Sequence, residues 1–434
     1  IIWSSEDQNK VSVINGVILL RTVGGPTTIK ARTQDGGYEA ECKVSANLVP
    51  LDSISMSSEA TGEAGGNLSL SVSFTPANAS VTRLDWVSSD PSVAKVEDAG
   101  GNIKLLKVGT ATITATALDA GDGEKIGLCQ VEVMETGNLM GRFGAEGGTA
   151  IEKVRNTFEK IHDYLNDPST QESLPRIELG NFINLSELHV TGYPLDTADP
   201  PNVADNNPGY GKIDKTYAGI IYKEALRLIV VGKNSFKNIN ENGERPHIVL
   251  QFQGCPTQHR MNSGNTNIGG YAKSEVREYL VPITGKNDSG NFSAGLVAAG
   301  VPLDREEIIW APVRYVWQGY LDETTRSTQL DRITDKVWLP TEWEMFGSTN
   351  NSYETTASTQ TYFDYYKTNN LRIKYSPGAA KVQWYFLASP TTGTFMNFYA
   401  VWHLGDLSSA VAGSGAGLGW NNNGGGISPA FCVK

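Results

Sequence analysis

The C-terminal stretch 397–434 gathers side chains suited to recognition. Its acids, bases and imidazoles are limited to Asp406, Lys434 and His403, a set too sparse for acid–base catalysis. Aromatic rings supply flat contact area and small polar side chains supply adaptable donors and acceptors, the mixture typical of antibody paratopes. We therefore predict a ligand-binding face made of Tyr399, Trp402, His403, Asp406, Ser408, Ser409, Trp420, Asn421, Asn422 and Asn423. The alternative is that Trp402 and Trp420 turn into the core.

Other catalytic or metal-binding patterns are absent from the sequence. There is no G-x-S-x-G, H-E-x-x-H or Gly-rich dinucleotide motif, and the five histidines are scattered. The four cysteines, Cys42, Cys129, Cys255 and Cys432, lie far apart without C-x-x-C spacing, so we expect buried apolar side chains and neither disulfides nor zinc. We predict no enzyme activity, no cofactor and no metal.

The carboxylates of LPTEWEMFG, Glu342 and Glu344, stand two residues apart and cannot share one helix face. This spacing disfavours a pair of acid–base carboxylates. We expect Glu344 to accept a structural hydrogen bond, and Trp338 and Trp343 to lie in the core or its wall.

Several segments predict the elements that must hold this face. Thr149 and Glu152 form a capping box before a helix with Ile151, Val154, Phe158, Ile161 and Leu165 on its inner face. The glycines of the preceding GRFGAEGG predict a hinge. PHIVLQF predicts a strand, and a short helix begins near Lys273 with Val276, Tyr279 and Leu280 inward. The closing PAFCV predicts a last strand that follows the exposed WNNNGGG.

Size and charge limit the function classes. A chain of 434 residues implies two or three domains, and 46 glycines with 19% charged residues suit a β-rich protein. The net charge of -11, without a basic cluster, excludes nucleic acid and anionic membrane as main partners. No stretch is long enough to insert into a membrane. The opening IIWSSEDQNK is expected to lie in the middle of a domain.

The front of the chain contains an internal repeat. Residues 83–133 alternate apolar residues between turns at spacings typical of a β-sandwich, and Trp3 and Cys42 of the first copy correspond to Trp86 and Cys129 of the second. We expect both tryptophans to anchor sandwich cores. W-x-S-S-D and V-G-T-A-T-I-T-A resemble the group 2 bacterial immunoglobulin-like domains, whose modules act as spacers. The resemblance implies a partial module at 1–49 and a full one at 50–136.

A second resemblance is carried by IGGYAKSEVREYL at 268–280, VWLPTEWEMFG at 337–347 and GISPAFCVK at 426–434. These motifs resemble an uncharacterised domain family of gut bacteria and their phages, taken to have a C-type lectin-like fold. The resemblance implies an α+β C-type lectin-like domain at 137–434 with a core at about 225–434 and an N-terminal helical and loop extension. In that fold the last strand closes the domain and the preceding segment crosses the binding face.

The resemblance also raises alternatives. Calcium-dependent lectins carry E-P-N or Q-P-D with W-N-D, and only WNNN at 420–423 echoes these motifs. Formylglycine-generating enzymes share the topology but use cysteines for copper chemistry, for which Cys255 and Cys432 are poor candidates. Some relatives are diversified by retroelements that rewrite Asn codons, and residues 399–423 are rich in the products of such changes.

The predicted fold class is therefore multidomain, with all-β immunoglobulin-like sandwiches followed by an α+β lectin-like domain. We expect a binding protein displayed outside the cell, on a cell surface or a phage particle, that grips a protein or glycan on a cell surface. The alternatives are a structural subunit of a pilus or virion, which would assemble with copies of itself or other subunits, and a formylglycine-generating type of enzyme.

Overall fold

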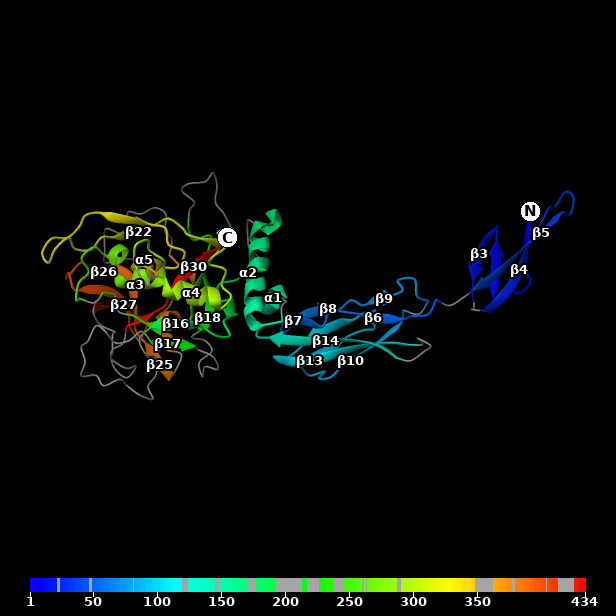
Figure 1. Ribbon diagram of the computed structural model, residues 1–434, viewed down its shortest axis with the longest axis horizontal. Coiled ribbons are helices and arrows are strands. Elements are labelled where there is room, and N and C mark those ends of the chain that lie inside the picture. The colour runs from blue at the N-terminus through cyan, green and yellow to red at the C-terminus, as the bar shows by residue number, and fades with distance from the viewer. Residues whose placement is uncertain are drawn as a thin grey trace. The chain divides into compact units, whose positions relative to one another are not determined.

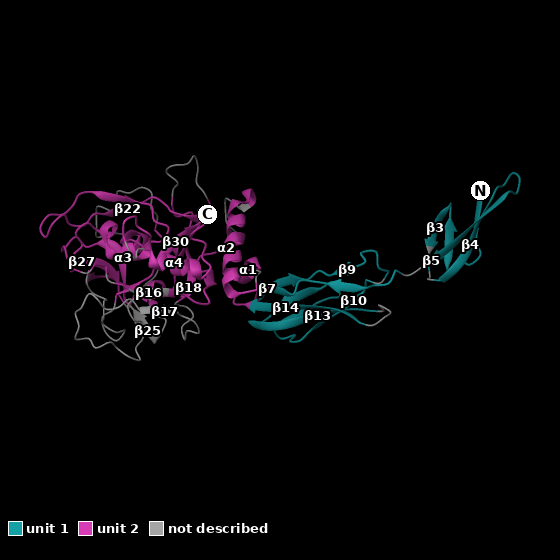
Figure 2. Cartoon of the chain, in the orientation of Figure 1, with its two compact units in different colours: residues 1–60, 65–133 teal, residues 61–64, 134–434 magenta. Residues whose placement is uncertain are grey.

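Two compact units make up the chain in the computed structural model: residues 1–60 with 65–133, and residues 61–64 with 134–434 (Figure 2). The structure describes residues 1–21, 24–46, 49–80, 82–118, 124–144, 148–170, 176–192, 213–216, 226–236, 246–259, 261–262, 264–286, 290–347, 362–367, 369–376, 379–402, 404–412 and 425–434. Within these ranges no helix is long and apolar enough to cross a membrane.

The first unit is built from strands, as its alternating sequence predicts. The first repeat contains β1 Ile2–Ser5, β2 Val11–Ile14, β3 Val17–Leu20, β4 Gly24–Arg32 and β5 Glu39–Ala46. The second contains β6 Ser53–Ser55, β7 Glu59–Glu63, β8 Asn67–Ser69, β9 Ser73–Thr75, β10 Leu84–Ser88, β11 Ala94–Val96, β12 Asn102–Leu105, β13 Gly109–Ala117 and β14 Lys125–Met134. β7 ends at Glu63, which is counted with the second unit.

The registers of the two copies agree. Trp3 pairs with Ala31 as Trp86 pairs with Ala115, and Cys42 pairs with Ile29 as Cys129 pairs with Ile113. The sheets run β1-β4-β5 in the first copy and β10-β13-β14-β7 in the second, with β11-β12-β8 and the pair β6-β9 beside the latter. The internal repeat is thus a repeat of strand pairing.

Two expectations for the first copy are wrong. Trp86 is buried, and its indole Nε1 donates to Ala99 O at 3.1 Å, but Trp3 is 37% exposed. Cys129 is buried, but Cys42 is exposed. The physical reason is that the two copies differ in their strands, because the described residues of the first copy contain no counterparts of β6–β9. Side chains that those strands would cover stay at the surface.

The second unit contains two five-stranded sheets (Figure 1). One has the order β15-β18-β19-β30-β21, made of Phe182–Asn184, Arg227–Lys233, Ile248–Phe252, Ala430–Val433 and Ile309–Trp310. The other has the order β20-β29-β26-β27-β28, made of Thr257–Gln258, Gly426–Ile427, Tyr385–Pro390, Asn397–Val401 and Leu407–Val411. Two-stranded pairs are β16 His189–Gly192 with β17 Ile213–Thr216, β22 Arg314–Trp317 with β23 Leu330–Ile333, and β24 Lys374–Ser376 with β25 Ala379–Gln383.

Helices of the second unit cover these sheets. They are α1 Leu139–Phe143, α2 Ala150–Asn166, α3 Glu275–Leu280, α4 Asn291–Ala298, α5 Glu342–Phe346 and α6 Asn369–Arg372, with short 3-10 turns at Pro168–Thr170, Tyr271–Lys273 and Asp364–Tyr366. α2 has the predicted capping box and buries Val154, Phe158, Ile161 and Leu165. α3 buries Val276, Tyr279 and Leu280 as predicted. Part of the predicted hinge is wrong, because α1 includes the GRF of GRFGAEGG between its caps Asn138 and Gly144.

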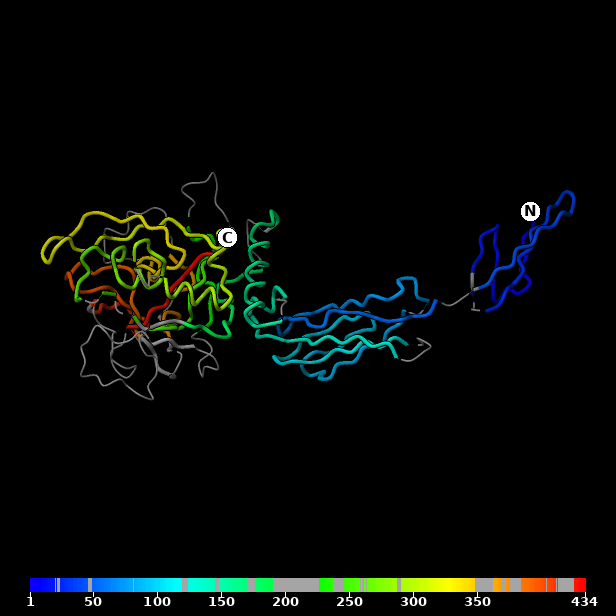
Figure 3. The backbone as a smooth tube through the Cα atoms, in the orientation of Figure 1, coloured from blue at the N-terminus to red at the C-terminus, as the bar shows by residue number. Residues whose placement is uncertain are grey.

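The closing strand occupies the interior of the second unit. β30 pairs antiparallel with β19 from Ile248↔Val433 to Gln251↔Ala430, which brings residues nearly two hundred positions apart side by side (Figure 3). All four β30 residues are buried, and Phe431 meets Phe158 of α2 with ring centroids 6.1 Å apart. PAFCV is therefore a core strand, as its apolar run predicts.

Candidate functional site

The three family-like motifs meet in the interior of the second unit. Leu339 N donates to the Tyr271 hydroxyl at 3.2 Å, which joins the first motif to the second. Trp338 and Ala430 exchange backbone hydrogen bonds of 3.0 and 2.8 Å, which join the second motif to the third. Tyr271, Trp338 and Ala430 are all buried. The motifs therefore hold the scaffold together.

Glu344 has a structural role, as expected. It completes the capping box of α5 with Thr341, and its carboxylate receives Arg314 Nε at 2.9 Å and Nη2 at 2.8 Å. Both side chains of this ion pair are fully buried. Trp338 is fully buried and Trp343 is half-buried, so the two tryptophans lie in the core and its wall.

Five predicted site residues lie in the described β27–β28 hairpin. Tyr399 pairs with Ser409 and Ala400 with Ser408. Since paired residues of antiparallel strands lie on the same face, Tyr399 and Ser409 share one face of the sheet and Ser408 lies on the other. Phe398 and Ala400 on the second face are inaccessible, and on the first face Val401 is inaccessible while Tyr399 is half-buried against the core. The hairpin thus brings Tyr399 and Ser409 together and leaves Ser408 half-buried behind them.

The turn of this hairpin presents Trp402 and Asp406. Trp402 N donates to Asp406 O at 2.8 Å, and Gly405 N donates to Trp402 O at 2.9 Å. Gly405 has φ 82°, a left-handed conformation that favours glycine. Arg372 Nε donates to Gly405 O at 3.0 Å from beneath, so the turn is anchored to the body of the unit.

Trp402 lies against a second tryptophan that the sequence did not single out. Its ring is stacked on Trp384, with centroids 6.1 Å apart and planes 25° from parallel. Trp402 is 37% exposed and Trp384 is 9% exposed. Trp384 in turn meets Phe386 edge to face at 5.1 Å. The exposed indole is therefore pre-oriented by an aromatic wall, which lowers the entropy lost on binding.

The remaining predicted site residues lie outside the described residues: His403, Trp420, Asn421, Asn422 and Asn423. Their part in the binding face stays a prediction, as does that of the WNNNGGG segment. Trp384 and Arg372, which support the hairpin turn, were missed because they precede the predicted segment. The aromatic residues of KVQWYF are the only sequence signal for Trp384, and Arg372 has none.

A buried lysine, Lys374 of β24, belongs to a hydrogen-bond network inside the second unit. Lys374 Nζ donates to Phe252 O at 2.6 Å and lies 3.3 Å from the Tyr366 hydroxyl. Burial lowers the pKa of Lys374 to about 7. The Tyr366 hydroxyl donates to Gln251 Oε1 at 2.5 Å, and Gln251 Nε2 donates to Ser428 O at 2.8 Å. This network ties β24, β19 and the residues before β30 together.

The two cysteines of the second unit are fully buried. Burial raises the pKa of Cys255 to about 12, and it raises the pKa of Cys432 well above the ordinary value. A thiolate is the form that binds metals and attacks electrophiles. The burial of Cys255 and Cys432 thus favours their expected role as small apolar side chains.

Comparisons with known families match two parts of the chain. Residues 50–127 match the bacterial Ig-like domain (group 2), and residues 247–434 match a domain of unknown function, DUF6273. The first match confirms that the chain contains an immunoglobulin-like domain of the expected group at 50–127, and the chain as a whole is multidomain and mostly β-sheet.

Individual relatives share shorter stretches. An Ig-like virion protein of Serratia phage KSP90 is 33% identical over 135 residues, 30% of this chain and 51% of that protein. A 3-O-alpha-D-galactosyl-alpha-L-arabinofuranosidase of Bifidobacterium longum subsp. longum is 38% identical over 92 residues, 21% of this chain and 8% of that protein. The chain thus spans about half or less of these relatives. Domains 4 and 5 of the S-layer protein SbsC align at 19% identity and a TM-score of 0.20, covering 30% of this chain and 75% of that one.

Proposed function

We propose that this chain is a binding protein displayed outside the cell. Immunoglobulin-like modules at 1–49 and 50–136 act as spacers, and a C-type lectin-like domain at 137–434 carries the ligand site. The match of residues 50–127 to bacterial Ig-like domains supports the spacers, and the likeness to a phage virion protein supports an extracellular place on a cell surface or particle.

The observation that carries the proposal is the aromatic pair of Trp402 and Trp384. A tryptophan that is 37% exposed yet stacked on a buried partner offers a rigid amphipathic surface. Aromatic side chains of this kind dominate the energetics of interfaces. Tyr399 and Ser409, which pair on β27 and β28, add a ring and a hydroxyl on the face of the hairpin opposite Ala400. The ligand is a protein or glycan on a cell surface.

The proposal includes no catalysis. In the formylglycine-generating type of enzyme, reactive cysteines would have to form thiolates, and the buried Cys255 and Cys432 are held as neutral thiols by raised pKa values. The rival proposal is a structural subunit of a pilus or virion, which the name of the phage relative favours. In that case the same surface would contact neighbouring subunits.

A binding experiment separates these functions. The full chain is applied to a glycan array and to fixed bacterial cells, beside Trp402→Ala, Tyr399→Ala and Ser409→Ala variants. A matched control is Tyr38→Ala, at an aromatic that is 78% exposed in the first unit. We expect the three hairpin variants to lose binding and the control to retain it. Equal binding by all variants would refute the site.

Sequence variation offers a second test. If residues 399–423 form a diversified binding face, the same locus in several isolates should differ mainly at Asn-derived codons in this segment. Changes spread evenly over the second unit would contradict diversification. Self-association that Trp402→Ala abolishes, without any ligand binding, would favour the structural subunit.

A further inference from the structure

A pocket of about 520 Å³ lies beside α4, and none of its lining residues belongs to the β27–β28 hairpin that carries the proposed binding face. Its walls come from the end of α3, from one face of α4 and from the segments 303–304 and 334–336. α3 and α4 are neighbours in the second unit (Figure 1). The volume falls within the roughly 300–1,000 Å³ of small-molecule sites in proteins.

Apolar side chains make up most of the pocket wall. Val281 and Pro282 follow α3, Val297 comes from α4, and Leu303 closes the opposite side. Val281 and Leu303 are 6% and 5% exposed, so they belong to the fixed core. A ligand that fills this space gains stability by removing apolar surface from water. The body of the ligand is therefore aliphatic or aromatic.

Most polar groups of the pocket already have partners. Ser293 Oγ donates to Leu280 O. The buried carboxylate of Asp335 accepts Arg277 Nε and Nη2, each at 2.8 Å. These groups have little capacity left for a ligand, and their charges are compensated within the protein.

Of the two charged side chains at the mouth of the pocket, Lys336 has partners within the protein and Asp304 has none among the described residues. Lys336 Nζ donates to Leu303 O at 2.9 Å and lies 3.7 Å from the carboxylate of Glu306. Asp304 is exposed and makes no hydrogen bond or ion pair with any residue that the structure describes. Asp304 thus contributes the one uncompensated charge of the described lining, and that charge is negative.

We propose that this pocket binds a small amphiphilic amine, whose apolar body fills the space between α3 and α4 and whose ammonium group pairs with Asp304. The ligand of this proposal is a free small molecule, because the pocket volume is in the range of small-molecule sites and exceeds what one lysyl side chain would fill. Because Asp304 stays hydrated at the mouth, the ion pair adds selectivity for charge, and apolar contact supplies most of the affinity.

The test compares three probes of one length that differ in charge. Hexylammonium chloride, hexan-1-ol and sodium hexanoate are titrated into the full chain near neutral pH, with saturation-transfer NMR as the readout. We expect hexylammonium to bind about threefold tighter than hexanol, the ratio that an exposed ion pair supplies. Hexanoate should bind most weakly, because Asp304 repels it.

Variants tie the result to the pocket. Ala294→Trp places a large ring from an exposed position of α4 into the pocket and should abolish binding of all three probes. Ala298→Trp, at an exposed residue of α4 outside the lining, is its control and should leave binding unchanged. Asp304→Asn should equalise hexylammonium and hexanol, whereas Glu323→Gln, at an exposed acid outside the lining, should not.

Three results would overturn the proposal. The first is that hexanoate binds as tightly as hexylammonium, which would make Lys336 the anchor. The second is unchanged binding in the Ala294→Trp variant, and the third is the absence of saturable binding by any probe. A thermal melt of each variant shows whether the fold is kept, and a second blocking variant, Val297→Phe, serves if Ala294→Trp does not fold.

Discussion

Arg314 and Glu344 form a two-point ion pair in the interior of the second unit, with both side chains fully buried. Arg314 also donates to Leu339 O at 3.1 Å, and Glu344 accepts the amide of Thr341 at 2.8 Å. One pair therefore connects β22, the capping box of α5 and the segment before it. A buried pair of this kind specifies packing more than it adds stability.

Removal of one partner should be strongly destabilising. Arg314→Met or Glu344→Gln alone leaves a buried charge without its partner, so the free energy of unfolding should fall by about 3–5 kcal/mol. The double variant Arg314→Met/Glu344→Gln should lose less than the sum of the single variants, since no charge stays buried. Denaturant unfolding followed by tryptophan fluorescence measures this change. The signal comes mainly from the second unit, because only Trp3 and Trp86 among the nine tryptophans lie in the first unit.

Arg332→Met is the matched control for this experiment. Arg332 is exposed on β23, the strand that pairs with β22. It should change the unfolding free energy by less than about 0.5 kcal/mol, as surface substitutions do. Strictly additive effects of the two single variants would show that the pair is not coupled.

Lys374 should make stability depend on pH. Its pKa is lowered to about 7 by burial. Between about 7 and the ordinary lysine value near 10.4 the unfolded chain binds a proton that the folded chain does not, so the free energy of unfolding rises with pH. The rise is about 1.4 kcal/mol per pH unit within this window. Below this pH window Lys374 is protonated in both the folded and the unfolded chain, and its contribution to the free energy of unfolding is constant and unfavourable.

The measurement is a series of unfolding curves from neutral to alkaline pH for the native chain and Lys374→Met. The variant should lack this part of the slope, since groups other than Lys374 titrate equally in both proteins. Lys367→Met, at an exposed lysine of the second unit, should keep the native slope. Parallel curves for the native chain and Lys374→Met would mean that Lys374 is charged in the folded state.

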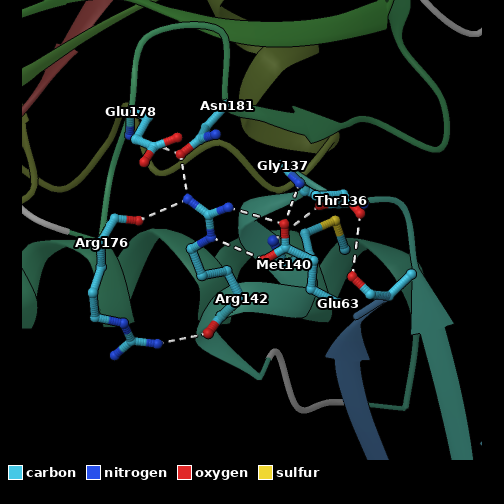
Figure 4. A network of polar contacts seen from close by, with 10 residues as sticks. Glu63, Thr136, Gly137, Met140, Arg142, Arg176, Glu178 and Asn181 are labelled. Atoms are coloured by element: carbon cyan, nitrogen blue, oxygen red, sulfur yellow. Dashed lines mark hydrogen bonds and ion pairs between the residues drawn. The ribbon is translucent and has the colours of Figure 1, made fainter. Parts of the chain in front are cut away.

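Glu63 and Arg142 form a second ion pair, shown with its neighbours in Figure 4. Arg142 Nε and Nη2 both donate to the Glu63 carboxylate at 2.9 Å, and Gly137 N donates to it as well. Burial raises the pKa of Glu63, but Arg142 and the Gly137 amide outweigh this effect and hold it below its ordinary value. The pair thus links Thr61–Ala64 to α1 within the second unit.

Glu63→Gln should lower the free energy of unfolding by about 1–3 kcal/mol at neutral pH, because the partly buried Arg142 loses a charged acceptor. A depressed carboxyl pKa stabilises the fold above the unfolded pKa, and this stability is lost as the pH falls through the folded value. Unfolding curves of variant and native chain should therefore converge in acid. Asp163→Asn, at an exposed acid of α2, is the control; a difference that persists undiminished in acid would contradict the account.

Local patterns predicted the elements of this protein well. The capping box of Thr149 and Glu152, the inner face of α3 and the apolar run of β30 depend on residues within one turn or strand, so short-range spacing identifies them. The register of the two front copies was predictable for the same reason, since repeated motifs imply repeated pairing.

Long-range relations were not predictable from one sequence. Arg314 and Glu344 stand thirty positions apart, and nothing in either motif names the other. The exposure of Cys42 depends on strands that its own copy does not show, although Cys42 and Cys129 occupy the same register. At the candidate site, Trp402 was predicted, but the stack with Trp384 depends on how β26 lies beside the hairpin turn.

That stack supplies the sharpest test of the binding face. Trp384→Ala removes a nearly buried ring that touches Phe386 and Trp402, and it should lower the free energy of unfolding by about 3–5 kcal/mol. Trp402→Ala removes a ring that is partly exposed in a turn held by backbone hydrogen bonds. It should lower that free energy by less than about 2 kcal/mol, near the ordinary range for single substitutions.

For ligand binding, in contrast to stability, Trp402 should matter more than Trp384. Trp402→Ala should abolish ligand binding in a chain that melts close to the native temperature, whereas Trp384→Phe, which keeps an aromatic wall, should retain most of both binding and stability. Thermal melts and the cell and glycan assays, run side by side on each variant, measure both quantities. If Trp402→Ala collapsed the melt, Trp402 would be a core residue and the binding face would have to lie elsewhere; if it bound normally while folded, the aromatic pair would be part of the scaffold only.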